Sequence, residues 1–278
     1  MAKQCVIQGT LGQTTGIAKE KGGLYIMEEP NMKNKQLVAQ CTNLETWHQS
    51  EFKIKDLGSL GYFLGIEAHM NTNGLNICQR KYALDILEEA GFLNCKPFAT
   101  PMVPGQRLNK ENGSPLSDAA PYRRLVGRLL YLTATRPDLT YTTQQLSQFV
   151  DSPTSEHMSA AHRVLHYIKG APRQGLLYPA NSRIQLHVFA DSDWASCPET
   201  RKSITGFCIF LGSALISWRC KKQMTVSRSS SEAEYRSLAS TVCETQWITS
   251  LLSDLQCKPV KPAAVFCDSK SAIAIVEN

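Results

Sequence analysis

The chain has 278 residues, 42% of them hydrophobic, which is enough to bury a core in one large or two ordinary domains. No run approaches the roughly 18 apolar residues of a membrane span, and the N-terminus lacks the charged-then-apolar pattern of a secretory signal. Ten scattered cysteines without C-x-x-C spacing disfavour a zinc site or a disulfide framework and predict a reduced, cytoplasmic or nuclear protein.

The net charge of +6 is concentrated in one part of the sequence. Between His157 and Arg228, ten Lys and Arg residues face three Asp and Glu residues, so this span alone carries +7. Such a density of positive charge favours a polyanionic partner, whose phosphates would give salt-dependent binding. An ordinary solvated surface is an equally good explanation of the charge on its own.

Residues 1–49 have the weakest pattern and are predicted to be poorly structured, apart from a strand at 24–27. From Phe52 onward the pattern predicts strand, turn, strand and helix. Asn73-Gly74 is a turn signal between two apolar runs, and the helical spacing that follows stops at Gly91. Five prolines in 94–121 predict a loop or connector.

Two or three helices are predicted between residues 121 and 178, punctuated by prolines. Their apolar stripes consist of Val126, Leu129, Leu130 and Thr133 in the first and Ala161, Val164, Leu165 and Ile168 in a later one. His157, His162 and His166 lie in the same region, but no third metal ligand accompanies the last two on one helix face. We therefore expect solvated or capping histidines rather than a metal site.

From residue 184 the sequence predicts a sheet with acids at its ends. Apolar and polar residues alternate from 184 to 190, which is typical of a strand, and Asp191 lies where this strand should end. A hairpin follows at 204–218. Serines at 229–231 precede Glu232 and Glu234 at the start of a long amphipathic helix. A short strand at 265–267 then ends in Asp268, and a helix follows it.

Acids at two strand ends and a helix start can bring three carboxylates together. Three such groups could not stay ionised side by side without divalent cations to hold them. Two metal ions about 3.5–4 Å apart are the known use of such a cluster in phosphodiester cleavage. Asp193 is a reserve for Asp191, and each aspartate could instead be a simple turn or cap residue. Glu232 and Glu234 both fit a capping box, so either could merely satisfy the first turn of the helix.

Several motifs resemble Pol polyproteins of copia-type retrotransposons. FADSDW, RKSITGF, SSSEAEY and CDSKSAIA are similar to the ribonuclease H domain of that family. KDLGSLGYFLGIE, QRKYALDIL, YRRLVGRLLYL and TRPDL are similar to its reverse transcriptase after the polymerase active site, and TTGIAKEKGGLYIMEEP resembles its pre-integrase stretch. The resemblance implies an α/β fold: a mainly helical palm-end, thumb and connection region at 50–180, then an incomplete ribonuclease H-like mixed sheet at 183–278.

The resemblance also implies a chemistry and a substrate. Asp191, Glu234 and Asp268 would be the catalytic residues and hold two Mg²⁺ ions, for cleavage of RNA in an RNA–DNA hybrid. Glu234 is favoured over Glu232 because the family's ligand is followed directly by a large apolar residue, here Tyr235. The nucleic acid would be bound by the basic residues Arg201, Lys202, Lys221, Lys222 and Arg228.

Two features of the family are missing from the sequence. No two aspartates are adjacent, so the Y-x-D-D turn of the polymerase is absent and no polymerisation is expected. The family's fourth nuclease acid would lie beyond Asn278, ten positions past Asp268, which predicts a weak or inactive nuclease. The alternatives are a non-catalytic nucleic-acid-binding module and an unselected fragment; the oligomeric state stays open.

Overall fold

Residues 62–243 and 263–278 form one structural unit of the computed structural model, and residues 1–61 with 244–262 form another. The structure describes residues 4–8, 14–21, 24–28, 61–255, 257, 259 and 261–277. In the second of these units, β1 (Gln4–Gln8), β2 (Thr14–Lys21) and β3 (Leu24–Glu28) make an antiparallel sheet in that order.

The predicted strand at 24–27 is therefore confirmed as β3, and two further strands occupy a segment in which the sequence indicated little regular structure. Both carry β-branched residues, as in QCVIQ and TTGI, which suit a pleated sheet. The Gln, Gly, Lys and Asn residues around them weaken the strand pattern in the sequence. The predicted strand that starts at Phe52 lies outside the described residues.

A second antiparallel sheet contains β4 (Tyr62–Phe63), β5 (Ile66–Asn71), β6 (Gly74–Cys78) and β7 (Gly175–Pro179), in that order. The predicted turn is confirmed: Asn71 Oδ1 accepts hydrogen bonds from Asn73 N at 2.8 Å and Gly74 N at 3.2 Å. Gly74 has a φ of +138°, and a Cβ there would lie 2.1 Å from the Tyr178 carbonyl oxygen, so only glycine fits.

Four helices share one hydrophobic core: α2 (Arg80–Glu89), α3 (Ala120–Leu132), α4 (Thr140–Ser147) and α5 (Ser155–Gly170). The predicted stripe of α5 is confirmed, because Ala161, Val164, Leu165 and Ile168 are all fully buried. In α3 the prediction was wrong for Leu130, which is 48% exposed. The buried stripe of this helix instead runs through Tyr122, Val126, Leu129 and Leu132, a spacing of three and four.

Two of the three histidines of α5 make specific contacts in the structure. His157 is fully buried, so the solvated interpretation is wrong for it, but the capping interpretation is confirmed: its ring accepts from Thr154 N at 3.0 Å and its Nε2 lies 3.0 Å from the Asn109 carbonyl oxygen. His166 stacks on Phe98.

A buried arginine precedes the short 3₁₀ helix η1 (Pro137–Leu139) ahead of α4. Arg136 is 1% exposed, and its guanidinium donates to both carboxylate oxygens of Asp138 at 2.8–3.2 Å and to the Ala171 carbonyl oxygen at 3.0 Å. The ion pair with Asp138 is local to η1, and the hydrogen bond to Ala171 connects the start of η1 to the end of α5.

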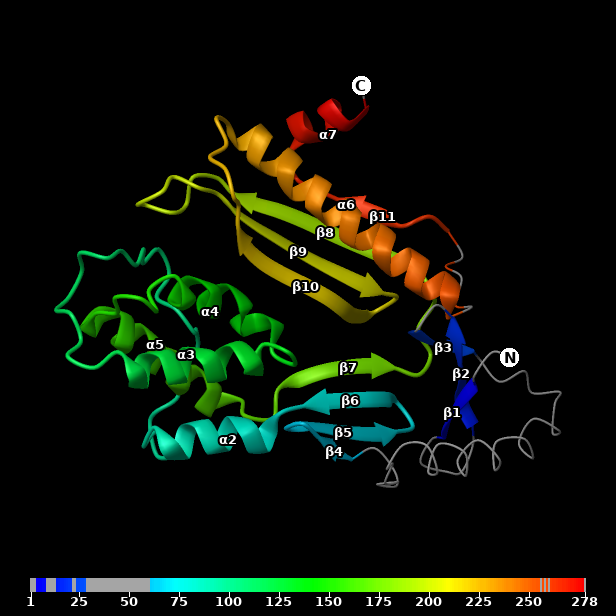
Figure 1. The fold of residues 1–278 in the computed structure, drawn as a ribbon, viewed down its shortest axis with the longest axis horizontal. Helices are drawn as coiled ribbons and strands as arrows, with labels where there is room; N and C mark the ends of the chain where they lie inside the picture. Colours follow the sequence, from blue (N-terminus) through cyan, green and yellow to red (C-terminus); the bar gives the residue numbers. More distant parts are fainter. Residues whose placement is uncertain are drawn as a thin grey trace. The chain divides into compact units, whose positions relative to one another are not determined.

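The third sheet is mixed, with the strand order β10-β9-β8-β11. β8 (Leu186–Asp193), β9 (Ile204–Leu211) and β10 (Ala214–Lys222) are antiparallel, while β11 (Ala264–Phe266) pairs with β8 in parallel. α6 (Ser230–Asp254) begins beside this sheet and its first half lies along one face (Figure 1). α7 (Lys270–Glu277) follows β11. The expected hairpin, helix and parallel strand are all present.

β8 alternates as predicted, but it begins and ends two residues later than predicted. Leu186, Val188, Ala190 and Ser192 are buried, whereas Phe189 and Asp191 are exposed. The strand ends at Asp193 instead of Asp191 because pairing with β9 continues through Asp193 opposite Ile204. No helix in the described part of the chain has the length and apolarity needed to cross a membrane.

Candidate acidic site

Asp191 and Asp268 lie level with each other on neighbouring parallel strands. β11 pairs with β8 so that Phe266 is opposite Phe189, and each aspartate follows its phenylalanine by two residues. Neighbouring strands are only about 4.8 Å apart, so this register alone brings the two acids to the same edge of the sheet.

The two acids at the start of α6 have different roles. Glu232 N donates to Ser229 Oγ at 3.2 Å, and Glu232 Oε2 accepts from Arg228 N at 2.8 Å, which resembles a capping box except that the acid accepts from the residue before Ser229. Glu232 also pairs with Arg236 at 2.8 Å. Glu234 is 7% exposed and points to β8 instead. The capping interpretation therefore holds for Glu232, and Glu234 is left for the acidic site.

Three carboxylates meet at the end of β8. Ser192 N donates to Asp191 Oδ1 at 2.8 Å and to Glu234 Oε1 at 3.2 Å, so one N–H holds both carboxylates. The potential ligand atoms of Glu234, Cys267 and Asp268 all lie within 4.8 Å of one another. Asp191 is outside this tighter group but adjoins it through Glu234. Cys267 has a place that the sequence did not indicate: its Sγ is 3.8 Å from Glu234 Oε2 and donates to it.

The charge on Glu234 is disfavoured in the folded protein. Burial raises the pKa of its carboxyl above the ordinary 4.5, and the negative charges of Asp191 and Asp268 raise it further, against the Ser192 N–H, which lowers it. A site that packs two acids around one buried carboxylate suits a bound cation, which would relieve this repulsion.

We expect Glu234→Gln to stabilise the metal-free protein at pH 7. The folded-state pKa lies above the unfolded one, so the folded protein binds the proton more tightly and ionisation at higher pH costs stability. The variant should therefore gain free energy of unfolding over the parent at pH 7, and this gain should vanish below about pH 4.5, where both states are protonated. Urea unfolding in EDTA at pH 7 and pH 4 measures the difference.

Glu232→Gln is the matched control, and we expect it to change the free energy of unfolding in the opposite direction. The hydrogen bond from Arg228 N and the contact with Arg236 lower the pKa of Glu232, so its charge stabilises the fold above the unfolded pKa. Its replacement should cost stability at pH 7, and the cost should disappear as pH falls through the lowered pKa. A Glu234→Gln variant that is less stable than the parent at pH 7 would contradict the arrangement.

Gln223 holds the sheet and the helix in place around the acids. Its Nε2 donates to the Ala233 carbonyl oxygen at 3.0 Å and to Thr205 Oγ1 at 3.1 Å, and lies 3.3 Å from Ser192 Oγ. Ser227 Oγ donates to Gln223 Oε1 at 3.0 Å. No local pattern marks this residue, because its partners come from two strands and a helix far apart in the sequence.

Asp193 is exposed on β8, as Asp191 is. After the larger effect of burial, its charge raises the pKa values of Tyr141 and Cys220, and it is not among the charges that raise the pKa of Glu234. The reserve role of Asp193 stays a prediction.

A basic cavity of about 270 Å³ lies beside Gln223. Its lining includes the predicted Lys221 and Lys222 together with Arg219 and Arg236. Lys222 also donates to Gln148 Oε1 at 2.7 Å, which ties β10 to the end of α4. The other predicted basic residues, Arg201, Lys202 and Arg228, are not among those that line the cavity.

Comparison with known proteins shows similarity to reverse transcriptases and to Pol polyproteins of transposons. Residues 32–104 match a family model described as reverse transcriptase (RNA-dependent DNA polymerase). The chain is 43% identical over 227 residues to the retrovirus-related Pol polyprotein from transposon RE1 of Arabidopsis thaliana, covering 82% of this chain and 16% of that protein. It is 32% identical over 257 residues to the corresponding polyprotein from transposon TNT 1-94 of Nicotiana tabacum, covering 88% of this chain and 19% of that one.

The chain covers most of a shorter relative. An uncharacterized mitochondrial protein of Arabidopsis thaliana, AtMg00810, is 46% identical over 198 residues, which is 71% of this chain and 82% of that protein. The chain thus spans less than a fifth of the polyproteins it matches and most of the shorter relative.

Proposed function

The chain belongs to the Pol family of copia-type retrotransposons, and from this premise we propose that residues 183–278 are a ribonuclease H-like domain that cleaves the RNA strand of an RNA–DNA hybrid. The observation that carries the proposal is the meeting of Asp191, Glu234 and Asp268 at the end of β8. Residues 50–180 would be the palm-end, thumb and connection region, which the same family places ahead of the nuclease.

The donor set fits Mg²⁺. Carboxylate oxygens are the ligands that this hard cation takes in proteins, and Asp191, Glu234 and Asp268 supply them. Cys267 is a soft donor unsuited to Mg²⁺, and its hydrogen bond to Glu234 gives it an orienting role instead. Bound there, a pair of Mg²⁺ ions would supply an activated water and charge stabilisation at the leaving oxygen.

The chain's own residues would position the substrate and the acids. The Ser192 N–H aligns Asp191 with Glu234, and Gln223 keeps β8, β9 and α6 together. The basic cavity of Arg219, Lys221, Lys222 and Arg236 lies next to Gln223 and can hold phosphates of the hybrid. With three carboxylates, we propose that this chain alone binds Mg²⁺ weakly and cleaves slowly. We also propose that, without the adjacent aspartates of the Y-x-D-D turn, this chain does not polymerise DNA.

A non-catalytic nucleic-acid-binding module is the second candidate. The basic cavity favours it, because phosphate binding there needs none of the three acids. A chain of this kind would bind hybrid with strong salt dependence and cleave nothing.

A single-turnover cleavage assay distinguishes the nuclease from the non-catalytic binding module. The purified full chain, in excess over a hybrid with labelled RNA, is incubated with Mg²⁺ or with EDTA. We expect slow cleavage of the RNA strand that requires Mg²⁺ and spares the DNA strand. Binding without cleavage would establish the binding module instead, and fast multiple turnover would contradict the proposed weakness of the site.

A further inference from the structure

One group of potential metal ligands among the described residues contains a thiol. A carboxylate oxygen of Glu234, one of Asp268 and the Sγ of Cys267 all lie within 4.8 Å of one another. Asp191 is outside this group. Cys267 and Asp268 directly follow β11, and the parallel pairing of β11 with β8 carries both to the end of the sheet that Glu234 faces. Cysteine spacing cannot reveal such a mixed site, because only one thiol takes part.

The separation of the sulfur from the nearest carboxylate suits a tetrahedral cation. Cys267 Sγ lies 3.8 Å from Glu234 Oε2. Zinc–sulfur and zinc–oxygen bonds of about 2.3 Å and about 2.1 Å, at a tetrahedral angle, place the two ligand atoms about 3.6 Å apart. A zinc ion could therefore bind between the two side chains with little movement of either one.

Glu234 Oε2 is a buried acceptor without a strong donor. Glu234 is 7% exposed, and its other oxygen, Oε1, accepts from Ser192 N at 3.2 Å. Within the described part of the chain, the hydrogen bond that reaches Oε2 comes from the Cys267 thiol, which is a weak donor. A buried carboxylate oxygen with so little compensation is costly, and a cation that binds both the oxygen and the sulfur would relieve this cost.

Cys267 is held beside the acids by packing. It contacts the buried side chains of Ala190, Leu238 and Ala272, which belong to β8, α6 and α7 in that order. Three elements thus fix the position of the thiol before any metal binds. Cys267 is nevertheless only partly buried, so a cation from solvent can reach it.

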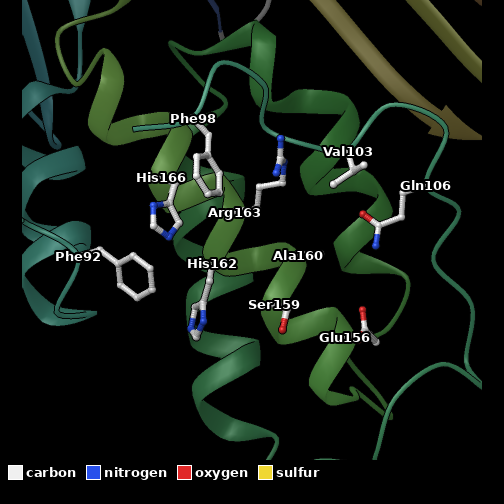
Figure 2. A pocket seen from close by; sticks show the side chains of 10 residues that line it. All are labelled: Phe92, Phe98, Val103, Gln106, Glu156, Ser159, Ala160, His162, Arg163 and His166. Atoms are coloured by element: carbon white, nitrogen blue, oxygen red, sulfur yellow. The ribbon is translucent and has the colours of Figure 1, made fainter. Parts of the chain in front are cut away.

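The histidines of α5 do not form a competing site among the described residues. His162 and His166 line a cavity between α5 and the connector that follows α2 (Figure 2). The His166 ring stacks on Phe98, and its Nδ1 lies 2.6 Å from the Lys96 carbonyl oxygen. Within the described chain, no group of three closely spaced ligating side chains includes either ring. A cation that prefers nitrogen or sulfur ligands is therefore expected at Cys267.

We propose that Glu234, Cys267 and Asp268 form a Zn²⁺ site, completed by water, and that Zn²⁺ bound there excludes the Mg²⁺ pair. Thiolate ligands select Zn²⁺ over Mg²⁺, which prefers oxygen. The Cys267 thiol releases its proton to the solvent when the sulfur binds the metal. Because both sites need Glu234 and Asp268, the two metals compete, and Zn²⁺ inhibits cleavage. The inhibition rests on the proposed function, whereas the binding of Zn²⁺ does not.

The first test replaces Zn²⁺ by Co²⁺, which gives a near-ultraviolet charge-transfer band when a thiolate binds it. The full chain, reduced and free of metal, is titrated with Co²⁺. We expect a band that is lost in Cys267→Ser and kept in Cys243→Ser, the matched control, because Cys243 is an exposed thiol outside the group. A band that is unchanged in Cys267→Ser, or no band in the parent with Co²⁺ in excess, would overturn the proposal.

Two further titrations separate this site from the proposed Mg²⁺ site. Asp191→Asn should keep the Co²⁺ band, because Asp191 lies outside the group of three ligands. Loss of the band in this variant would show that the thiolate site is assigned to the wrong residues. Excess Mg²⁺ should weaken the band of the parent protein. A band that persists in excess Mg²⁺ would overturn the competition between the metals and leave the Zn²⁺ site supported.

The second test uses the unmodified protein, so it does not depend on a variant folding. Its thiols are alkylated with and without Zn²⁺, and mass spectrometry of the peptides gives the rate at each cysteine. Zn²⁺ should protect Cys267 and leave the exposed Cys243 as reactive as before. Equal rates at Cys267 with and without Zn²⁺ would contradict the proposal. Neither test measures cleavage, so a failure of the nuclease proposal leaves both results interpretable.

Discussion

Asp191→Asn is expected to lower the rate of Mg²⁺-dependent RNA cleavage by more than about 100-fold, a loss of at least about 2.7 kcal/mol of transition-state stabilisation. The amide keeps the size of the side chain and can still accept from Ser192 N, but it removes one of the three negative charges that would hold the cations. Asp191 is exposed, so folding should be unaffected. Single-turnover cleavage of labelled hybrid measures the rate, and anisotropy should show an affinity within about twofold of the parent, since most binding energy comes from phosphate contacts.

Asp193→Asn is the matched control for this experiment. It makes the same change two residues further along the same strand, at an acid that is not among the charges that raise the pKa of Glu234. Its cleavage rate should stay within about threefold of the parent, as for a surface charge outside the site. If Asp193→Asn is the more damaging substitution, the assignment of Asp191 is wrong.

Asp138→Ala is expected to destabilise the protein by about 3–5 kcal/mol, the usual cost of leaving one partner of a buried ion pair unpaired. Arg136 is 1% exposed and donates to both oxygens of Asp138. Without that carboxylate its charge would keep the hydrogen bond to the Ala171 carbonyl oxygen at 3.0 Å and the Tyr167 ring at 5.6 Å, neither of which carries a neutralising charge. Urea unfolding monitored by circular dichroism measures the change.

Glu89→Ala tests whether burial causes the large loss of stability that we expect for Asp138→Ala. Glu89 pairs with Arg128 across α2 and α3, but its side chain is 63% exposed, so water screens the interaction. This variant should lose no more than about 1 kcal/mol, in line with exposed pairs generally. A similar loss in both variants would show that burial of Arg136 adds nothing to the contribution of its pair with Asp138.

The parts of the fold that the sequence predicted are those governed by local periodicity. The alternation in β8 and the stripe of α5 follow from the twofold and 3.6-fold repeats of a strand and a helix, and the Asn73-Gly74 turn follows from local turn chemistry. The stripe of α3 was misassigned at Leu130, because its neighbour Leu129 is equally apolar and only the packed helices decide which of the two is buried.

For the candidate site, too, the sequence predicted some residues and missed others. Asp191, Glu234 and Asp268 could be named from motifs because each lies at a strand end or a helix start. The sequence left Glu232 and Glu234 both open as capping residues, and the structure separates them by which one faces β8. Gln223 and Cys267 could not be found beforehand, since their roles depend on contacts between segments 10 to 33 residues apart.

The most direct test of the central claim, that three carboxylates share divalent cations, is a crystal structure of the full chain grown with Mn²⁺. Anomalous difference density locates Mn²⁺, which takes the same oxygen ligands as Mg²⁺. We expect a peak bounded by the carboxylates of Asp191, Glu234 and Asp268, with Glu234 still facing β8. Ordered carboxylates without a peak, under conditions in which Mn²⁺ is in large excess, would contradict it.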